Sequence, residues 1–574
     1  MSTDFATLYP SVNELVAEKV ASRVHVKDAT LYSFADEARE CAENFMGWAD
    51  LASNPPVKLK KIKKLADRFA DEGMKTVLLV GQGGSTQASM TMTKFIKDAN
   101  PRMKFRTMDS DSPVRLRKVL TAINPKSTVV IVSSKSGGTL EMRCMLAALR
   151  EVFLKEMSEK KFRSRLVAIT DPGSPLEQRA KSEGWAAILS GEPTVGGRFS
   201  ALSVFGLLPA ALVGIDIKAF VARAKEAEQR CSEDSPDNPA LQLAAFMFDS
   251  YKAGRAKLAF VTQKRGRVLG LWTEQLVAES TGKQGQGILP YLEVDPLLLA
   301  KDEGDRAVVT YCTEPEGSDE LIGFEKALSV LNPAIPRIDY RLDTVEDLAE
   351  HFVMWEYATA MCGYLMQVSP FDQPDVASAK AKVLEILDAG LPAPKFEAPL
   401  SAELDMGWVK VRTSECCSQA RDVRGALKCL FASMRPGDYF AVNAFLPFTG
   451  EGRGSALEAI RRTVAVRSGL ASCLEVGPRF LHSTGQLQKG GPDTGVFLVL
   501  SAEESVDVVL DKQPAVSLGK LAEAQATGDA LTLADRGRRC LHLHLPDNSA
   551  VTLRVLADMV DEVLLEIEAE RAQA

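Results

Sequence analysis

The sequence predicts an α/β protein built on parallel sheets, and three observations support this prediction. Apolar, β-branched runs that are typical of strands buried on both faces recur along the chain. Most of these runs are followed by a turn rich in glycine or hydroxyl residues, and then by an amphipathic helical pattern. This alternation favours a three-layer sandwich of helices around a parallel sheet. The runs in the first two thirds of the chain are 75–80, 128–132, 165–170, 186–189, 257–261 and 307–311.

Length and composition argue against several classes of function. The 574 residues give room for about three or four domains of about 150 residues each. The net charge of −7 is mildly acidic, which gives no support for nucleic acid or an acidic membrane as a partner. The start lacks the pattern of a secretory signal, and the longest apolar run, 199–215, is too short to span a membrane. We therefore expect a soluble, cytoplasmic protein.

Cysteines and histidines show no metal-binding pattern. The ten cysteines include no CxxC pair, and the five histidines lack the spacing of metal ligands. We expect no protein-bound metal. The lysine-rich run 57–64 has apolar residues every three or four positions, which favours a solvated helix face over an anion site.

The turn after the predicted strand 128–132 is a candidate phosphate site. A hydroxyl and glycine loop that opens a helix directs backbone N–H groups and the positive helix end at one point, which suits a phosphate dianion. An ordinary capped turn between a strand and a helix is the alternative reading, and the composition alone favours phosphate only slightly. The loop residues are Ser134, Lys135, Ser136, Gly137, Gly138 and Thr139.

Two further glycine loops follow predicted strands of the same sheet. Gly84 and Ser85 close the first, where glycines permit positive φ and close backbone approach to a ligand. Arg198 stands in the second, between a double glycine and an apolar helix. Its residue type fits either a ligand contact or an ion pair with a nearby carboxylate. Loops at the carboxyl ends of parallel strands can face one crevice.

Gln275 and Glu279 are four apart on a predicted helix over 268–281, so both lie on one face. A carboxylate on a partly apolar face is suited to be a proton-shuttling base. The alternative is an exposed glutamate beside a buried stripe.

The last third of the chain predicts a smaller, separate α/β domain. Pro392 and Pro394 mark a linker before it. Predicted strands lie at 439–446, 495–500 and 539–545, and predicted helices at 456–472 and 553–570. The polar, glycine-rich stretch 481–492 predicts a binding loop or a long turn.

Taken in order, five motifs resemble the phosphoglucose isomerase family. They are Gly81–Ser85, Ser134–Thr139, Gly196–Ser200, Glu279–Lys283, and Phe371–Pro374 with Lys380. The segment after residue 400 looks like the tail of the isomerase half of transaldolase and phosphoglucose isomerase fusions. The resemblance implies two sugar-isomerase-type three-layer domains with parallel sheets, plus the smaller C-terminal α/β domain. The expected division is a helical segment 1–70, a first such domain 71–240, a second 241–395, and a C-terminal domain 396–574.

The resemblance also implies an enzyme that interconverts glucose 6-phosphate and fructose 6-phosphate through ring opening and an enediolate, as a homodimer without cofactor or metal. Glu279 would be the base, and Arg198 would stabilise the negative oxygen of the intermediate. Lys380, with Gln373, would assist ring opening. The substrate-binding residues implied are Gly84, Ser85, Ser134, Lys135, Ser136, Gly137, Gly138, Thr139, Gln275 and Gln373.

The chain departs from the family pattern at two places. The phosphate loop is usually Ser-Lys-Thr-Phe-Thr-Thr, whereas Ser136, Gly137 and Gly138 here remove a hydroxyl and the aromatic ring. The ring-opening histidine expected between the Glu279 and Lys380 motifs is missing, since His351 stands in a predicted helix. His482, or Lys380 alone, could replace it. Two alternatives to this activity are a non-catalytic phosphosugar-binding module and an isomerase of another hexose or aminosugar phosphate.

Overall fold

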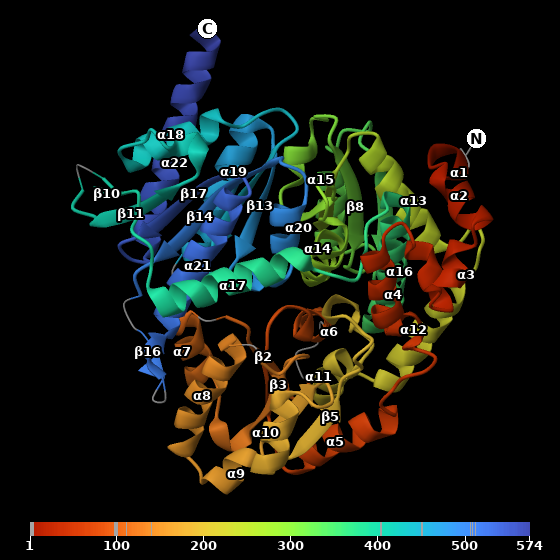
Figure 1. The fold of residues 1–574 in the computed structure, drawn as a ribbon. Helices are drawn as coiled ribbons and strands as arrows, with labels where there is room; N and C mark the ends of the chain where they lie inside the picture. The colour runs from red at the N-terminus through yellow and green to blue at the C-terminus, as the bar shows by residue number, and fades with distance from the viewer. Residues whose placement is uncertain are drawn as a thin grey trace. The chain divides into compact units, whose positions relative to one another are not determined.

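The computed structural model describes residues 5–96, 101–110, 112–138, 140–401, 404–448, 452–504, 507, 509–510 and 513–573. The chain forms two compact units. The first comprises Met1–Asp109 and Val119–Gln373, and the second comprises Ser110–Lys118 and Pro374–Ala574. Each unit is mixed α/β, as predicted (Figure 1).

The first sheet of the first unit is entirely parallel, in the order β2-β1-β3-β4-β5. The strands are β1 (Thr76–Val80), β2 (Lys104–Met108), β3 (Thr128–Ser133), β4 (Leu166–Thr170) and β5 (Ala187–Ser190). β1 and β3 are neighbours in register, with Val80 opposite Val132. The glycine loop after β1 and the hydroxyl loop after β3 therefore leave the sheet side by side.

The second sheet of this unit is also parallel, in the order β7-β6-β8-β9. Its strands are β6 (Lys257–Thr262), β7 (Leu289–Glu293), β8 (Arg306–Cys312) and β9 (Arg337–Arg341). The sequence did not predict β2, β7 and β9, which are edge strands. β2 and β9 carry charged residues at alternate positions and β7 contains Pro290, so none shows the apolar run of a central strand.

One continuous apolar core joins the two sheets and the helices of the first unit. Its central helix, α16 (Val345–Met366), is buried along almost its whole length and begins with a capping box formed by Thr344 and Asp347. The other helices are α1 (Phe5–Leu8), α2 (Ser11–Ala17), α3 (Val20–His25), α4 (Asp36–Phe45), α5 (Leu59–Asp71), α6 (Gln87–Phe95), α8 (Leu140–Leu154), α9 (Glu159–Arg163), α10 (Pro175–Glu183), α11 (Val204–Val213), α12 (Ile217–Cys231), α13 (Pro239–Lys252), α14 (Arg267–Thr281) and α15 (Asp319–Leu328).

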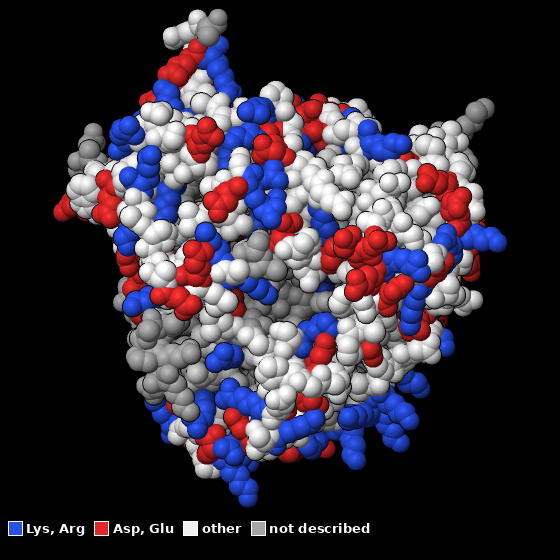
Figure 2. All heavy atoms as spheres, in the orientation of Figure 1, with Lys and Arg blue, Asp and Glu red and all other residues white. Residues whose placement is uncertain are grey.

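The lysine-rich run forms most of α5, which buries Ile62, Leu65 and Phe69 and leaves its lysines exposed. Figure 2 shows Lys and Arg side chains projecting from the edge of the molecule where Figure 1 places α5. Among the described residues, no helix is long and apolar enough to cross a membrane.

The second unit contains a sheet in the order β10-β11-β17-β14-β12-β13. β12 (Tyr439–Ala444), β13 (Ala471–Val476), β14 (Gly495–Ala502) and β17 (Arg539–Leu545) are parallel, whereas β10 (Phe396–Pro399) and β11 (Trp408–Thr413) are antiparallel. β15 (Val509–Leu510) and β16 (Gln513–Ser517) form a small separate pair. Its helices are α7 (Pro113–Thr121), which extends into the first unit, α17 (Pro374–Ala389), α18 (Val423–Ala432), α19 (Arg453–Ser468), α20 (Thr484–Gly490), α21 (Leu518–Asp535) and α22 (Ala550–Gln573).

The two faces of this sheet differ in chemistry. One face packs against α18, α19 and α22 in an apolar core. The other carries buried polar side chains, including Asn443 and His542, toward the side on which α21 lies across β14 and β17. There Lys489 of α20 forms an ion pair with Asp529 of α21 at 2.5 Å.

Two observations differ from the sequence expectations here. The stretch 481–492, predicted as a loop, contains the helix α20, which tertiary contacts of Gln486 and Lys489 hold in place despite its glycines. The unit boundary lies after Gln373, and α17 packs on α20 and α21, whereas the expected end of the second domain was residue 395.

Candidate active site

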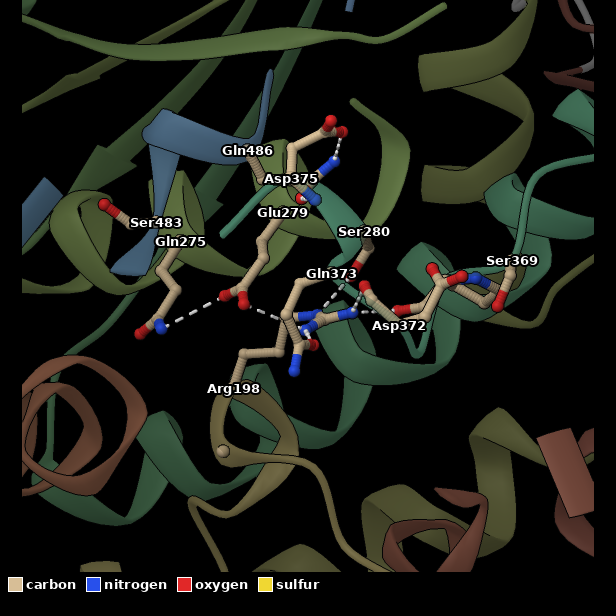
Figure 3. Close-up of polar contacts among 12 residues, drawn as sticks. Arg198, Gln275, Glu279, Ser280, Ser369, Asp372, Gln373, Asp375, Ser483 and Gln486 are labelled. Carbon is tan, nitrogen blue, oxygen red and sulfur yellow. Dashed lines mark hydrogen bonds and ion pairs between the residues drawn. The ribbon is translucent and has the colours of Figure 1, made fainter. Parts of the chain in front are cut away.

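The first unit brings together Arg198, Gln275 and Glu279 (Figure 3). Arg198 Nη1 lies 3.2 Å from Glu279 Oε1, and Gln275 Nε2 donates to Glu279 Oε2 at 3.2 Å. The two α14 side chains share a face because they are one helical turn apart. All three residues are buried, so Glu279 is not the exposed glutamate of the alternative reading. The result is a carboxylate held between a cation and an amide.

Arg198 is fixed by several neighbours besides Glu279. Its Nε donates to Ser280 Oγ at 2.8 Å, and its Nη1 donates to Gln373 Oε1 at 3.0 Å. Its Nη2 donates to the backbone oxygens of Pro370 and Asp372 at 2.6 and 2.9 Å. The planar guanidinium uses its fork of donors to hold the segment that precedes the second unit.

Close backbone contact with the arginine loop explains the glycine at position 84. A Cβ atom on Gly84 would lie 2.3 Å from the backbone carbon of Gly197, so only glycine fits there without a shift. Ser133 Oγ at the end of β3 donates to the Ser85 oxygen at 3.0 Å. The loop after β1 therefore contacts both the end of β3 and the arginine loop.

The candidate phosphate loop is a compact turn. Ser134 Oγ accepts from the Gly137 N–H at 3.1 Å, and Ser136 Oγ accepts from the Gly138 N–H at 3.4 Å. Gly137 has φ +69°, and a Cβ there would lie 2.8 Å from the Leu176 nitrogen. Ser136 and Gly138 are exposed. Thr139 lies outside the described residues.

Lys135 is engaged within the protein. Its Nζ lies 2.6 Å from Asp171 Oδ2 and donates to the Pro193 oxygen at 2.9 Å. An anion at this loop would meet the hydroxyl and backbone N–H groups, while the Lys135 ammonium is shared with Asp171.

A family model described as "Phosphoglucose isomerase" matches residues 60–287. Glucose-6-phosphate isomerase of Mycoplasmopsis pulmonis is 29% identical over 423 residues, covering 66% of this chain and 98% of the relative. Glucose-6-phosphate isomerase of Rippkaea orientalis is 36% identical over 256 residues, covering 43% of this chain and 47% of the relative. The chain is therefore similar to the phosphoglucose isomerase family, with the family model matching residues 60–287.

Solved structures agree with this family at the level of fold. A hypothetical protein from Thermus thermophilus aligns with a TM-score of 0.56 at 24% identity, covering 67% of this chain and 97% of that one. A glucose-6-phosphate isomerase from Chlamydia trachomatis aligns with a TM-score of 0.51 at 18% identity, covering 64% of this chain and 79% of that one.

The two candidate ring-opening groups, Lys380 and His482, belong to the second unit. Lys380 is an exposed residue of α17, and His482 ends the short helical turn before α20. Burial, and then the charge of Lys380, lower the pKa of His482 to about 3, so the imidazole is neutral at pH 7. Gln486 ties α20 to the start of α17, because it accepts from the Asp375 N–H at 3.0 Å and donates to Asp375 Oδ2 at 2.6 Å.

His351 has a structural role. Its Nδ1 lies 2.8 Å from the Tyr311 hydroxyl in the core, and burial lowers its pKa to about 3.

Sequence reasoning missed Lys283, Ser280 and the backbone oxygens that hold Arg198. Lys283 is buried, contacts Asp372 Oδ1 at 2.8 Å and donates to the Ser280 oxygen at 3.2 Å. It also donates to the oxygen of Ser369. The signal available in the sequence was a lysine inside the same motif as Glu279. Its partners lie far along the chain, so spacing alone could not identify them.

Proposed function

We propose that this protein interconverts glucose 6-phosphate and fructose 6-phosphate by ring opening followed by proton transfer through an enediolate. The observation that carries the proposal is the buried arrangement of Glu279 between Arg198 and Gln275. The relatives named glucose-6-phosphate isomerase support the same activity, and the chain spans nearly the whole length of the one from Mycoplasmopsis pulmonis.

Glu279 performs the proton transfer. Its carboxylate removes the proton from C2 of the open aldose, and the C2–H electrons form the C1–C2 double bond of the enediolate. In this step the C1 carbonyl electrons move to O1. The proton of the C2 hydroxyl then moves to O1, the C2 carbonyl forms, and the proton held by Glu279 returns at C1 to give the ketose. Arg198 and Gln275 hold the two carboxylate oxygens in fixed positions, so the base is oriented before substrate arrives.

Arg198 also offsets the negative charge that develops on the substrate oxygen. A guanidinium remains charged at all working pH values, and its donors are already directed by Ser280 and Gln373. Such a fixed cation needs no reorganisation when the charge appears.

The turn after β3 binds the 6-phosphate. Ser134, Ser136 and Thr139 supply hydroxyls, Gly137 and Gly138 supply backbone N–H groups, and Lys135 supplies charge shared with Asp171. Gly84 and Ser85 adjoin this turn through the contact between Ser133 and Ser85. Binding at the phosphate provides energy away from the reacting carbons.

Ring opening is assigned to Lys380, His482 and Gln373. A neutral imidazole can accept the proton of the C1 hydroxyl, and an ammonium can donate to the ring oxygen. The lowered pKa leaves the His482 imidazole neutral at pH 7 and also makes it a weak base. We further propose a cytoplasmic homodimer, whose oligomeric state light scattering would test. The mild charge of −7 supports the absence of nucleic acid or an acidic membrane as a partner.

The deciding experiment measures conversion of fructose 6-phosphate to glucose 6-phosphate, coupled to a glucose-6-phosphate dehydrogenase. Glu279→Gln should lower kcat by about 10²-fold or more while binding of the sugar phosphate persists. Glu274→Gln is the matched control, because Glu274 is a buried glutamate of the same helix whose Oε1 accepts from the Leu292 N–H at 3.0 Å. Binding of sugar phosphate without wild-type turnover would favour a non-catalytic binding module instead.

A further inference from the structure

A short segment at the end of the first unit is contacted by two buried cations, Arg198 and Lys283. We call Ser369–Gln373 the crossing segment, because Pro374 begins the second unit. Arg198 donates to Pro370, Asp372 and Gln373 of this segment. Lys283 donates to the Ser369 oxygen and pairs with Asp372 Oδ1 at 2.8 Å. Arg198 and Lys283 therefore both contact this five-residue segment, through different atoms.

Lys283 is itself rigidly placed. It directly follows Gly282, which ends α14, and its N–H donates to the Gln286 oxygen at 3.0 Å in a tight turn. Its ammonium donates to the oxygens of Ser280 and Ser369 and forms an ion pair with the Asp372 carboxylate. The side chain is almost fully buried, with 4% exposed. A buried cation is costly unless it is paired and hydrogen-bonded, and Lys283 has both kinds of contact.

We propose that Lys283 is a positioning residue of the isomerase reaction: it fixes the crossing segment, whose oxygens in turn hold the Arg198 guanidinium against Glu279. This role rests on the proposed function, since it matters for catalysis only if Arg198 and Glu279 carry the chemistry. Lys283 also donates to the oxygen of Ser280, whose Oγ accepts from Arg198 Nε at 2.8 Å. Lys283 therefore supports Arg198 through two separate routes.

A competing explanation assigns this task to Phe371. Its ring packs on Tyr32, Phe199 and Trp48 at centroid distances of 5.2, 5.6 and 6.3 Å. If this packing alone fixed the crossing segment, Lys283 would be dispensable. Aromatic packing places the ring, however, whereas the Arg198 contacts need the backbone oxygens of Pro370 and Asp372 to point in one direction.

The charges around Lys283 affect its pKa, so its positioning role should depend on pH. Burial, and then repulsion from Arg198, lower its pKa to about 8, while Asp372 and Glu279 oppose this shift. Cys41 of α4 also faces the cluster, and burial and Asp372 raise the pKa of its thiol. Loss of the Lys283 proton would remove the ion pair with Asp372. We expect kcat to fall on the alkaline side with an apparent pKa near 8.

The test compares Lys283→Met, Lys283→Arg and the control Lys257→Met in the full-length protein. Lys257 is the matched residue because it is also a buried lysine of the first unit, paired with Asp305 Oδ2 at 3.0 Å, and it stands at the first position of β6. Lys283→Met should lower kcat by about 10- to 100-fold with KM changed by less than about threefold, since a small misplacement of Arg198 affects the transition state most. Lys257→Met should keep kcat within about threefold, whatever its effect on melting.

Lys283→Arg should recover part of the lost kcat and move the alkaline limb to higher pH, because a guanidinium stays charged. Hydrogen–deuterium exchange of peptides covering 369–375 supplies a readout independent of turnover. Exchange there should rise in Lys283→Met and stay unchanged in Lys257→Met.

Unchanged exchange in Lys283→Met, or a kcat loss no larger than that of Lys257→Met, would overturn the positioning role. If the wild type itself fails to convert fructose 6-phosphate, the proposed isomerase function is wrong. In that case the exchange measurement still decides whether Lys283 fixes the crossing segment.

Discussion

Two buried ion pairs, Arg198–Glu279 in the first unit and Lys489–Asp529 in the second, are built differently. In the first unit, Arg198 and Glu279 are 3.2 Å apart, while the shorter bonds of Arg198, at 2.6 and 2.9 Å, go to backbone oxygens. In the second unit, Lys489 and Asp529 are 2.5 Å apart, and that contact is shorter than the 3.4 Å bond from Lys489 to the Gly485 oxygen. Arg198 thus divides its donors among several acceptors, whereas the shortest contact of Lys489 goes to the carboxylate of Asp529.

The largest effect should come from breaking the second pair. Lys489→Met leaves Asp529 buried without its cation, which should cost about 3–5 kcal/mol of the free energy of unfolding. Urea denaturation would measure it. The double variant Lys489→Met with Asp529→Leu should recover much of this loss, since a buried pair can be replaced by apolar residues of similar volume. A loss below about 1 kcal/mol in the single variant would contradict a structural role.

Breaking the first pair should instead affect catalysis. Lys in place of Arg198 keeps the charge but loses the fork that serves Ser280, Gln373 and the backbone oxygens. Arg198→Lys should lower kcat by about 10²-fold. Steady-state kinetics and thermal melting together test the contrast, because the comparison fails if Arg198→Lys destabilises as much as Lys489→Met.

A third buried group, the Glu356 carboxyl, has a pKa that is set mainly by desolvation. Glu356 of α16 is buried, and desolvation raises its pKa well above the ordinary value although the Ala201 N–H donates to it. The folded state keeps this carboxyl protonated while the unfolded chain ionises, so stability should fall as pH rises above about 4.5. Glu356→Gln should remove that loss and raise stability at pH 8 by about 1–3 kcal/mol.

Unfolding at several pH values would test Glu356. The difference between Glu356→Gln and wild type should shrink toward pH 4, where both chains are uncharged at this position. A difference independent of pH would show that packing, and not ionisation, separates the two proteins.

The smallest effect is expected at the phosphate turn. Ser136 is exposed, and its Oγ accepts only the long 3.4 Å bond from Gly138 among the contacts found for it, so Ser136→Ala should leave folding intact. If the hydroxyl contacts the 6-phosphate, KM should rise by about two- to tenfold with kcat nearly constant. Equal KM values in both proteins would remove Ser136 from the binding site.

The parts of the fold that could be predicted from sequence are those with local causes. β3 is apolar on both faces, and Gln275 and Glu279 share a face through helical spacing alone. The edge strands β2 and β9 could not be predicted, because they contain exposed charged residues and lack the apolar run of a central strand.

The site was predictable to the same extent. Gln275 and Glu279 come from one predicted helix, Arg198 and Gln373 come from two separate motifs, and the structure brings these four together. Lys283 escaped notice because its role depends on the oxygens of Ser369 and the carboxylate of Asp372, nearly ninety residues later. The proximity of Lys380 to His482 likewise depends on how α17 and α20 pack.

The division of the chain has a consequence for its synthesis. Residues 110–118 belong to the second unit, yet they emerge from the ribosome before most of the first unit and before all of 374–574. Pro113 and Leu116 of α7 are buried in the finished protein. These side chains cannot reach their final packing until the C-terminal third of the chain has been translated. Completion of the second unit is therefore a post-translational event, and truncation at 373 would leave this early segment without its own unit.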